Sequence, residues 1–180
     1  MTPPRQPLLH DALTVLRAPT QVWSAPSGEM GAAPIHGVYL ADVRLIRARQ
    51  LTVGGTPPEH IATGAARADA ARIQYLLREL DDATPDPGVR LEVDRTVDSD
   101  GVTEQLTLRS RHAEPITTTV EIELEADASL MESIKQGHRE AAGVTPSADG
   151  DVVRWSGESV DATLTTSGLA ARVDGARILL

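Results

Sequence analysis

The residues of this sequence that come closest to a catalytic set are its carboxylates. Hydrolysis of a glycosidic bond, for example, requires two carboxyl groups across the scissile bond, one as acid and one as base or nucleophile. Asp42 together with Asp127 or Glu132 would supply the residue types. Nothing in the sequence brings these residues together, and the chain contains 26 Asp and Glu in all. We therefore predict no catalytic residue in this chain.

Metal and cofactor chemistry have no support in the motifs either. The five histidines show no ligand spacing such as His-x-x-x-His, and the absence of cysteine excludes a Cys-ligated zinc site. Residues 27–32 (SGEMGA) lack the Lys-Ser/Thr of a phosphate loop, and no Gly-x-Ser-x-Gly elbow occurs. Glu121, Glu123 and Glu125 are interpreted as the solvated face of a strand rather than a calcium site. No metal and no cofactor are expected.

The composition narrows the choice of partners and of compartment. A formal net charge of −9 argues against nucleic acid and against an anionic membrane as the main partner. Only four aromatic residues are present, so few side chains are available as stacking platforms for sugar rings. No apolar run approaches ~20 residues, and the N-terminus has no long apolar segment with a cleavage site. We expect a cytoplasmic protein.

Alternating apolar residues indicate the strands that must position any site. Residues 91–97 (LEVDRTV) place Leu91, Val93, Arg95 and Val97 on one face. The turn at 98–101 leads to a returning arm with Leu106 and Leu108 on its apolar face, and 116–125 form the next strand. We expect these three segments to form an antiparallel meander that a second sheet covers.

Shorter signals extend the same pattern over the chain. They predict an edge strand at 13–16 and strands at 21–25, 38–40, 45–53, 152–155, 159–166 and 169–173. Residues 41–42 form a bend, and 130–143 are a loop with one helical turn. Residues 65–80 are compatible with a helix by propensity, but the alternation in 72–79 favours a strand.

The expected architecture is therefore mainly β, an antiparallel β-sandwich of the supersandwich type with few or no helices. Residues 1–19 form an extended N-terminal arm, disordered over its first six residues, and 20–180 form the sandwich domain. The chain ends on Ile178, Leu179 and Leu180, which resemble a strand whose neighbours are missing. This ending predicts a piece of a longer protein.

Two motif groups in this order resemble the N-terminal domain of bacterial glycogen debranching enzymes of the amylo-α-1,6-glucosidase type. The first is GVYLADVR at 37–44, which resembles the family's Gly-aromatic-x-x-Asp-Thr-Arg motif. The second comprises Asp127, Met131, Ile134, Lys135 and Gly137, similar to the family's Asp-x-x-x-Met tail. The likeness covers about residues 20–140. Val43, Gln105 and Ala128 depart from the usual residues.

The resemblance implies a β-sandwich that precedes an (α/α) barrel, in which the hydrolytic carboxylates of such enzymes lie. The expected partner is therefore a C-terminal (α/α) barrel catalytic domain of the parent chain, with α-glucan at the domain interface. The fragment alone is expected to be inactive. The alternatives are a stand-alone binding or assembly module that self-associates as a homo-oligomer through an open sheet edge or face, and a small hydrolase in its own right.

Six residues of the two motifs are candidates for a cleft-facing or interface-facing surface. They are Gly37, Tyr39, Asp42, Arg44, Lys135 and Gly137. In the functional interpretation, Asp42 and Arg44 shape the mouth of the barrel's cleft through charge-assisted hydrogen bonds. In the structural interpretation, Asp42 closes the bend after Leu40 and pairs with Arg44, while Lys135 and Gly137 lie on a solvated loop.

Overall fold

The structure is a computed structural model that describes residues 10–81, 87–137 and 143–180. Its largest element is a seven-stranded antiparallel sheet. In spatial order the strands are β1 (Leu13–Arg17), β2 (Thr20–Ser24), β3 (Gly37–Leu40), β4 (Val43–Val53), β9 (Val120–Ala126), β14 (Arg177–Leu179) and β13 (Arg172–Asp174). The long central pair is β4 with β9, in a register that places Leu51 opposite Ile122.

Two smaller antiparallel sheets complete the molecule. The four-stranded sheet consists of β5 (Glu59–Arg67), β6 (Ala70–Leu76), β7 (Val89–Val97) and β8 (Val102–Ser110). The three-stranded sheet consists of β10 (Ser147–Asp149), β11 (Val152–Ser156) and β12 (Asp161–Thr165). Helical structure is limited to a 3₁₀ turn, η1 (Arg78–Leu80), and to α1 (Met131–Lys135). None of the described helices is long and apolar enough to cross a membrane.

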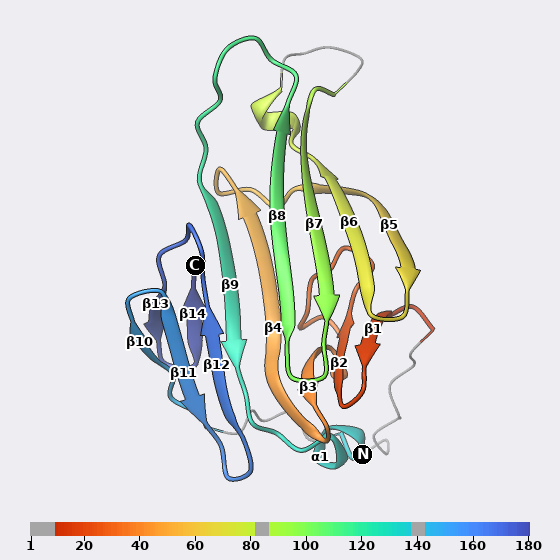
Figure 1. Cartoon of the computed structure of the whole chain (residues 1–180), viewed down its shortest axis with the longest axis vertical. Coiled ribbons are helices and arrows are strands. Elements are labelled where there is room, and N and C mark those ends of the chain that lie inside the picture. The colour runs from red at the N-terminus through yellow and green to blue at the C-terminus, as the bar shows by residue number, and fades with distance from the viewer. Residues whose placement is uncertain (1–9, 82–86, 138–142) are drawn as a thin grey trace, which may run out of the picture.

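One hydrophobic core joins the three sheets. The large sheet contributes Leu51, Ile122 and Ile178, whereas β7 contributes Leu91 and Val93. Val153, Trp155 and Ala162 of the three-stranded sheet belong to the same cluster. Both smaller sheets thus cover the large one, and Figure 1 shows them at its two ends, with β5–β8 in yellow to green near β1–β3 and β11–β12 in blue near β13–β14. The prediction of a mainly β, antiparallel sandwich is confirmed.

Most of the predicted strands are present. The pattern at 91–97 forms β7, which pairs with β8 across the turn at 98–101, and the predicted edge strand forms β1. The favoured strand at 72–79 is β6 up to Leu76, followed by η1, and the single helical turn after residue 130 is α1. The end of the predicted loop, 138–142, and the first nine residues of the predicted arm lie outside the described residues.

The predicted three-stranded meander is wrong. The third strand, β9, does not pair with β8 but lies in the seven-stranded sheet between β4 and β14. The connection over residues 111–119 is longer than the two to five residues of a typical hairpin loop, and it crosses from one layer to the other. Alternation identifies the buried face of a strand, and a strand in either layer turns that face towards the same core.

The expectation that the terminal strand lacks neighbours is also wrong. β14 pairs with β9 on one side and with β13 on the other. Ile178 is fully buried in the common core, and the backbone N–H of Leu180 donates to the carbonyl of Ile122 at 3.0 Å. Burial within this fold therefore accounts for the apolar side chain of Ile178, whereas Leu179 is exposed.

Candidate functional site

The two motif groups meet at one corner of the sandwich, through a buried ion pair that we call the corner pair, Arg44 and Asp127. Arg44 Nε lies 2.6 Å from Asp127 Oδ2, and the two side chains are 6% and 0% exposed. Arg44 is the second residue of β4, and Asp127 follows directly after the end of β9. The neighbouring strands β4 and β9 thus bring together residues separated by 83 positions in the sequence.

Asp127 also organises the backbone that follows it. Its Oδ1 accepts hydrogen bonds from the backbone N–H groups of Ala128 and Ser129 and from the Ser129 hydroxyl, at 2.9, 3.1 and 2.7 Å. The Trp155 indole N–H donates to the Asp127 carbonyl at 3.3 Å. Through these hydrogen bonds the carboxylate fixes the turn that leads into α1.

α1 and the loop before β3 cover the outer face of the sheet at this corner. Ile35, Tyr39, Met131 and Ile134 form a small apolar cluster of buried residues. The Tyr39 hydroxyl donates to the Ile35 carbonyl at 2.9 Å, and burial raises its pKa. The backbone N–H of Met131 donates to the Asp42 carbonyl at 2.8 Å. The second motif is therefore fastened to the bend of the first.

Gly37 is required by the close approach of β3 to β4. Its φ is +152°, and a Cβ at this position would lie 2.5 Å from the Ile46 carbonyl oxygen and 2.6 Å from Arg44 Cδ. Arg44 extends past this glycine to donate to the Pro34 carbonyl at 2.8 Å and to the His36 carbonyl at 3.4 Å. The glycine thus leaves the space through which the guanidinium reaches the loop.

The six candidate residues separate into a buried and an exposed set. Gly37, Tyr39 and Arg44 lie inside the corner, whereas Asp42, Lys135 and Gly137 are exposed on it. Arg44 makes its ion pair with Asp127, and not with Asp42 as the structural interpretation expected. The corner therefore presents Asp42 and α1 to solvent, with the corner pair as support beneath them.

The acids considered as a catalytic pair have different environments. Asp127 is fully buried and engaged on both oxygens, whereas Asp42 and Glu132 are exposed. Within residues 10–81, 87–137 and 143–180, no three His, Asp or Glu side chains are grouped so that they could hold a metal ion. The corner thus has the features of a packed and partly exposed surface, in which Asp127 is engaged with Arg44 and with the backbone that follows it.

A second charged cluster lies between the two larger sheets, and sequence reasoning missed it. We call Arg49, Arg95 and Glu104 the interior triad. Glu104 Oε2 lies 2.8 Å from Arg49 Nη2, and its Oε1 lies 2.7 Å from Arg95 Nη2. The arginine side chains are 2% and 0% exposed and that of Glu104 is 18% exposed. A usable signal existed, because Arg95 and Glu104 are directly opposite each other in the β7–β8 register.

In the interior triad, the two arginines stabilise the ionised form of Glu104. Burial by itself would raise the pKa of Glu104, but the charges of Arg49 and Arg95 and their hydrogen bonds lower it to about 2. Because arginine stays protonated, the triad has one negative and two positive groups at neutral pH. Arg95 uses its remaining donors on the Ser24 hydroxyl and the Gly28 carbonyl, both at 3.0 Å, and so ties the loop after β2 to the second sheet.

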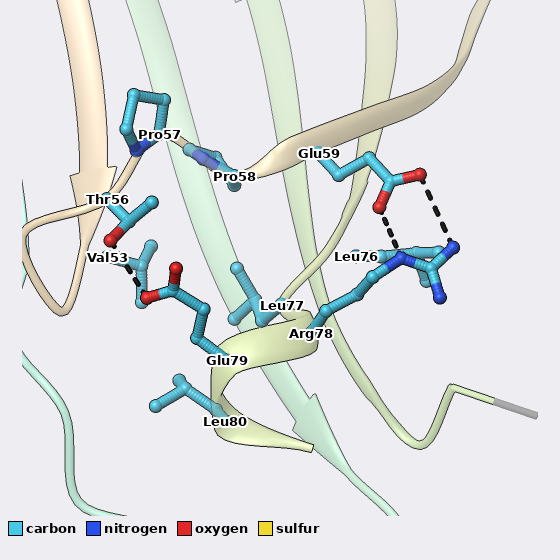
Figure 2. Close-up of a pocket in the computed structure, with 10 residues that line it drawn as sticks. All are labelled: Val53, Thr56, Pro57, Pro58, Glu59, Leu76, Leu77, Arg78, Glu79 and Leu80. Carbon is cyan, nitrogen blue, oxygen red and sulfur yellow. Dashed lines mark hydrogen bonds and ion pairs between the residues drawn. The ribbon is translucent and has the colours of Figure 1, made fainter. Parts of the chain in front are cut away.

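A small pocket lies near η1 at the opposite end of the sandwich. Figure 2 shows its polar side chains engaged with each other, Arg78 with Glu59 and Thr56 with Glu79. Apolar side chains such as Val53, Leu77 and Leu80 line the rest. The volume is about 180 Å³, below the ~300 Å³ at which ligand sites of proteins usually begin. We assign this pocket no function.

Fold and corner together define an antiparallel β-sandwich domain in which two distant motifs are joined by a buried ion pair. A comparison with protein-family models matches residues 15–178 to the N-terminal domain of (some) glycogen debranching enzymes. The chain belongs to this family, as the two motif groups predicted. The comparisons with curated proteins and with solved structures gave no match.

Proposed function

We propose that this chain is the non-catalytic accessory domain at the N-terminus of a cytoplasmic glycogen debranching enzyme of the amylo-α-1,6-glucosidase type. In this proposal it packs on an (α/α) barrel glycosidase domain and shapes the α-glucan cleft of that barrel. The observation that carries the proposal is the family match over residues 15–178. The ion pair of buried Asp127 with Arg44, which joins the two motifs, supports a structural role for this carboxylate.

The corner that joins the two motifs is the surface we assign to the barrel. Its exposed residues include Asp42, Lys135 and Leu130, which is 50% exposed. A mixture of one large apolar side chain with charges of both signs is typical of an interface between domains. The corner pair and the apolar cluster beneath hold these residues in place, so the surface is preorganised for docking.

Hydrogen exchange tests this assignment. The gene is read beyond Leu180, and the chain is expressed alone and together with the barrel that follows. We expect the backbone amides of residues 41–43 and 130–135 to exchange more slowly in the presence of the barrel, because docking removes them from solvent. The amides of β5, on the far edge of the four-stranded sheet, serve as the internal control. A stop codon after Leu180, or unchanged exchange at the corner, contradicts the proposal.

One observation favours the second candidate, a stand-alone assembly module. β8 is the edge of the four-stranded sheet, and Leu108 on this strand is 40% exposed. An open edge can pair with the same edge of a second copy. The other exposed large apolar residues of the described chain come from separate segments, Leu16, Ile61, Leu130 and Leu179. Sedimentation distinguishes the candidates, since a monomer over a wide concentration range excludes the module.

A further inference from the structure

A cleft of about 530 Å³ opens on the outer face of the seven-stranded sheet, next to the corner. One side is formed by β4 and β9, which contribute Arg47, Gln50 and Glu125. Since Leu51 and Leu124 belong to the core, the adjacent Gln50 and Glu125 must point to the opposite face. The other side is the loop 25–34, which contributes Glu29 and the small residues Gly31 and Ala32.

The loop that walls this cleft is held by buried side chains. The interior triad reaches it through Arg95, which donates to the Gly28 carbonyl, and the Tyr75 hydroxyl donates to the Ser27 carbonyl. Met30 and Arg49 exchange two backbone hydrogen bonds, at 3.0 and 3.2 Å. Small residues then follow, and Gly31 comes so close to Ala48 that an added Cβ would lie 3.3 Å from the alanine methyl. The cleft is thus preformed, with a fixed wall.

The polar groups of the cleft favour a neutral ligand rich in hydroxyl groups. On the side of the cleft formed by β4 and β9, Arg47 pairs with Glu125. Arg47 Nε is buried and has no hydrogen-bond partner among the described residues. Glu29 and Glu125 outnumber Arg47, while Arg44 at the end of the cleft is neutralised by Asp127. An anion would meet this negative excess, and the described residues offer no group of three acids or histidines for a cation.

We propose that this cleft binds a short segment of α-glucan, independently of any barrel domain. The hydroxyl groups of a sugar both donate and accept hydrogen bonds, so they can bind a guanidinium and carboxylates that lie side by side. The volume lies within the range of sites for small ligands. The choice of an α-glucan among polyhydroxyl ligands rests on the proposed function, since the family belongs to glycogen debranching enzymes.

The test is a titration of the full 180-residue chain, ¹⁵N-labelled, with maltoheptaose, followed by NMR. We expect shift changes confined to residues 25–34 and to the cleft positions of β4 and β9. The dissociation constant should be on the order of 1 mM, because no aromatic platform lines the cleft. Gln50→Ala should weaken binding about fivefold, and Arg47→Met about tenfold or more, because an arginine contributes charge-assisted hydrogen bonds.

Controls separate the cleft from the rest of the surface. Gln50 is exposed, so Gln50→Ala retains the fold. Gln105 is exposed on β8, and Gln105→Ala is the matched control that should bind as tightly as the unsubstituted 180-residue chain. Titration with inorganic phosphate should leave the cleft signals unchanged. Absent shifts, shifts scattered over other surfaces, equal shifts with phosphate, or full binding by both cleft variants would each overturn the proposal.

The outcome is independent of the test for the proposed function. Hydrogen exchange at residues 41–43 and 130–135 reports on docking to the barrel, whereas the titration reports on the cleft of the chain alone. Docking without glucan binding rejects only the cleft site. Glucan binding without docking rejects only the accessory role.

Discussion

The corner pair and the interior triad are two solutions to the same problem, a charge buried inside a sandwich. In the corner pair, one guanidinium meets one carboxylate, and the second oxygen of Asp127 is used by local backbone N–H groups. In the interior triad, a single carboxylate serves two guanidinium groups from different sheets, β4 and β7. The corner pair therefore organises a turn, whereas the triad connects two layers and the loop beside them.

This difference predicts different consequences of losing a charge. Removal of the Asp127 charge leaves one buried arginine without a counter-charge, but the turn can keep its hydrogen bonds. Removal of the Glu104 charge leaves two arginines that are almost inaccessible to water. An uncompensated buried charge is among the largest single destabilising effects in proteins. The triad should therefore be the more sensitive cluster.

The largest effect is expected from Glu104→Gln. This change keeps the shape of the side chain but leaves Arg49 and Arg95 without a negative partner, and we expect the free energy of unfolding to fall by about 4 to 5 kcal/mol. Urea denaturation measures it. Glu59→Gln, in the exposed pair with Arg78, is the matched control and should leave the midpoint nearly unchanged. Equal losses in the two variants would contradict the account.

Asp127→Asn should lower the free energy of unfolding less, by about 3 to 4 kcal/mol, because it leaves only Arg44 without a negative partner. The asparagine oxygen can still accept from the backbone N–H groups of Ala128 and Ser129. The same denaturation experiment measures the loss, and hydrogen exchange of residues 130–135 shows whether it is local. A loss larger than that of Glu104→Gln would reverse the proposed order of the two clusters.

Protonation of Glu104 at low pH should remove the stabilisation that the triad provides. The pKa of Glu104 is about 2 in the folded chain against a usual value of 4.5, so the unfolded chain binds the proton first. This stabilisation is fully present above about pH 4.5 and is lost as the pH falls to about 2, and amounts to about 3 kcal/mol. Denaturation of the unsubstituted 180-residue chain and of Glu104→Gln at several pH values isolates this contribution. Parallel pH profiles would refute it.

Gly37→Ala tests the space that Arg44 requires at the corner. The new methyl group would collide with the Ile46 carbonyl and with the arginine stem, and we expect a loss of about 2 kcal/mol. Gly64→Ala is the control, because a Cβ there meets nothing within 4 Å. Its effect on the thermal midpoint should be small. A Gly37→Ala chain as stable as Gly64→Ala would mean that the corner adapts without cost.

The smallest expected effect is that of Ala41→Gly, in the bend between the two strands of the first motif. Ala41 has a φ of +50°, which is unfavourable for a residue with a Cβ. Glycine removes this cost but gives the unfolded chain more freedom, so we expect a gain of under about 1 kcal/mol. A thermal melt measures it. A lower midpoint would show that the bend is not strained.

The sequence predicted the strands better than their partners. Alternation identified β7 and placed Arg95 on its buried face, and the motifs named both Arg44 and Asp127. It could not reveal that β9 joins β4, because a period of two does not specify the neighbouring strand. The same limitation hid the ion pair of Arg44 with Asp127, since that contact exists only where β4 and β9 lie side by side.

The interior triad was within reach of the sequence. Glu104 continues the alternation of Leu106 and Leu108 by one step, onto the same face of the returning arm. Opposite charges on the buried faces of two strands of one hairpin indicate a pair across the strands. The addition of Arg49 depends on how the two sheets are stacked, and no local pattern contains that information.

The central claim is that this domain supplies structure and contacts while the hydrolytic chemistry belongs to another domain. The most direct measurement is the release of glucose from a branched α-glucan by the purified 180-residue chain. The account predicts a rate equal to that of buffer, because Asp127 at the corner is buried and held in an ion pair with Arg44. Turnover above buffer that persists through purification and is abolished by Asp42→Asn or Glu132→Gln would contradict it.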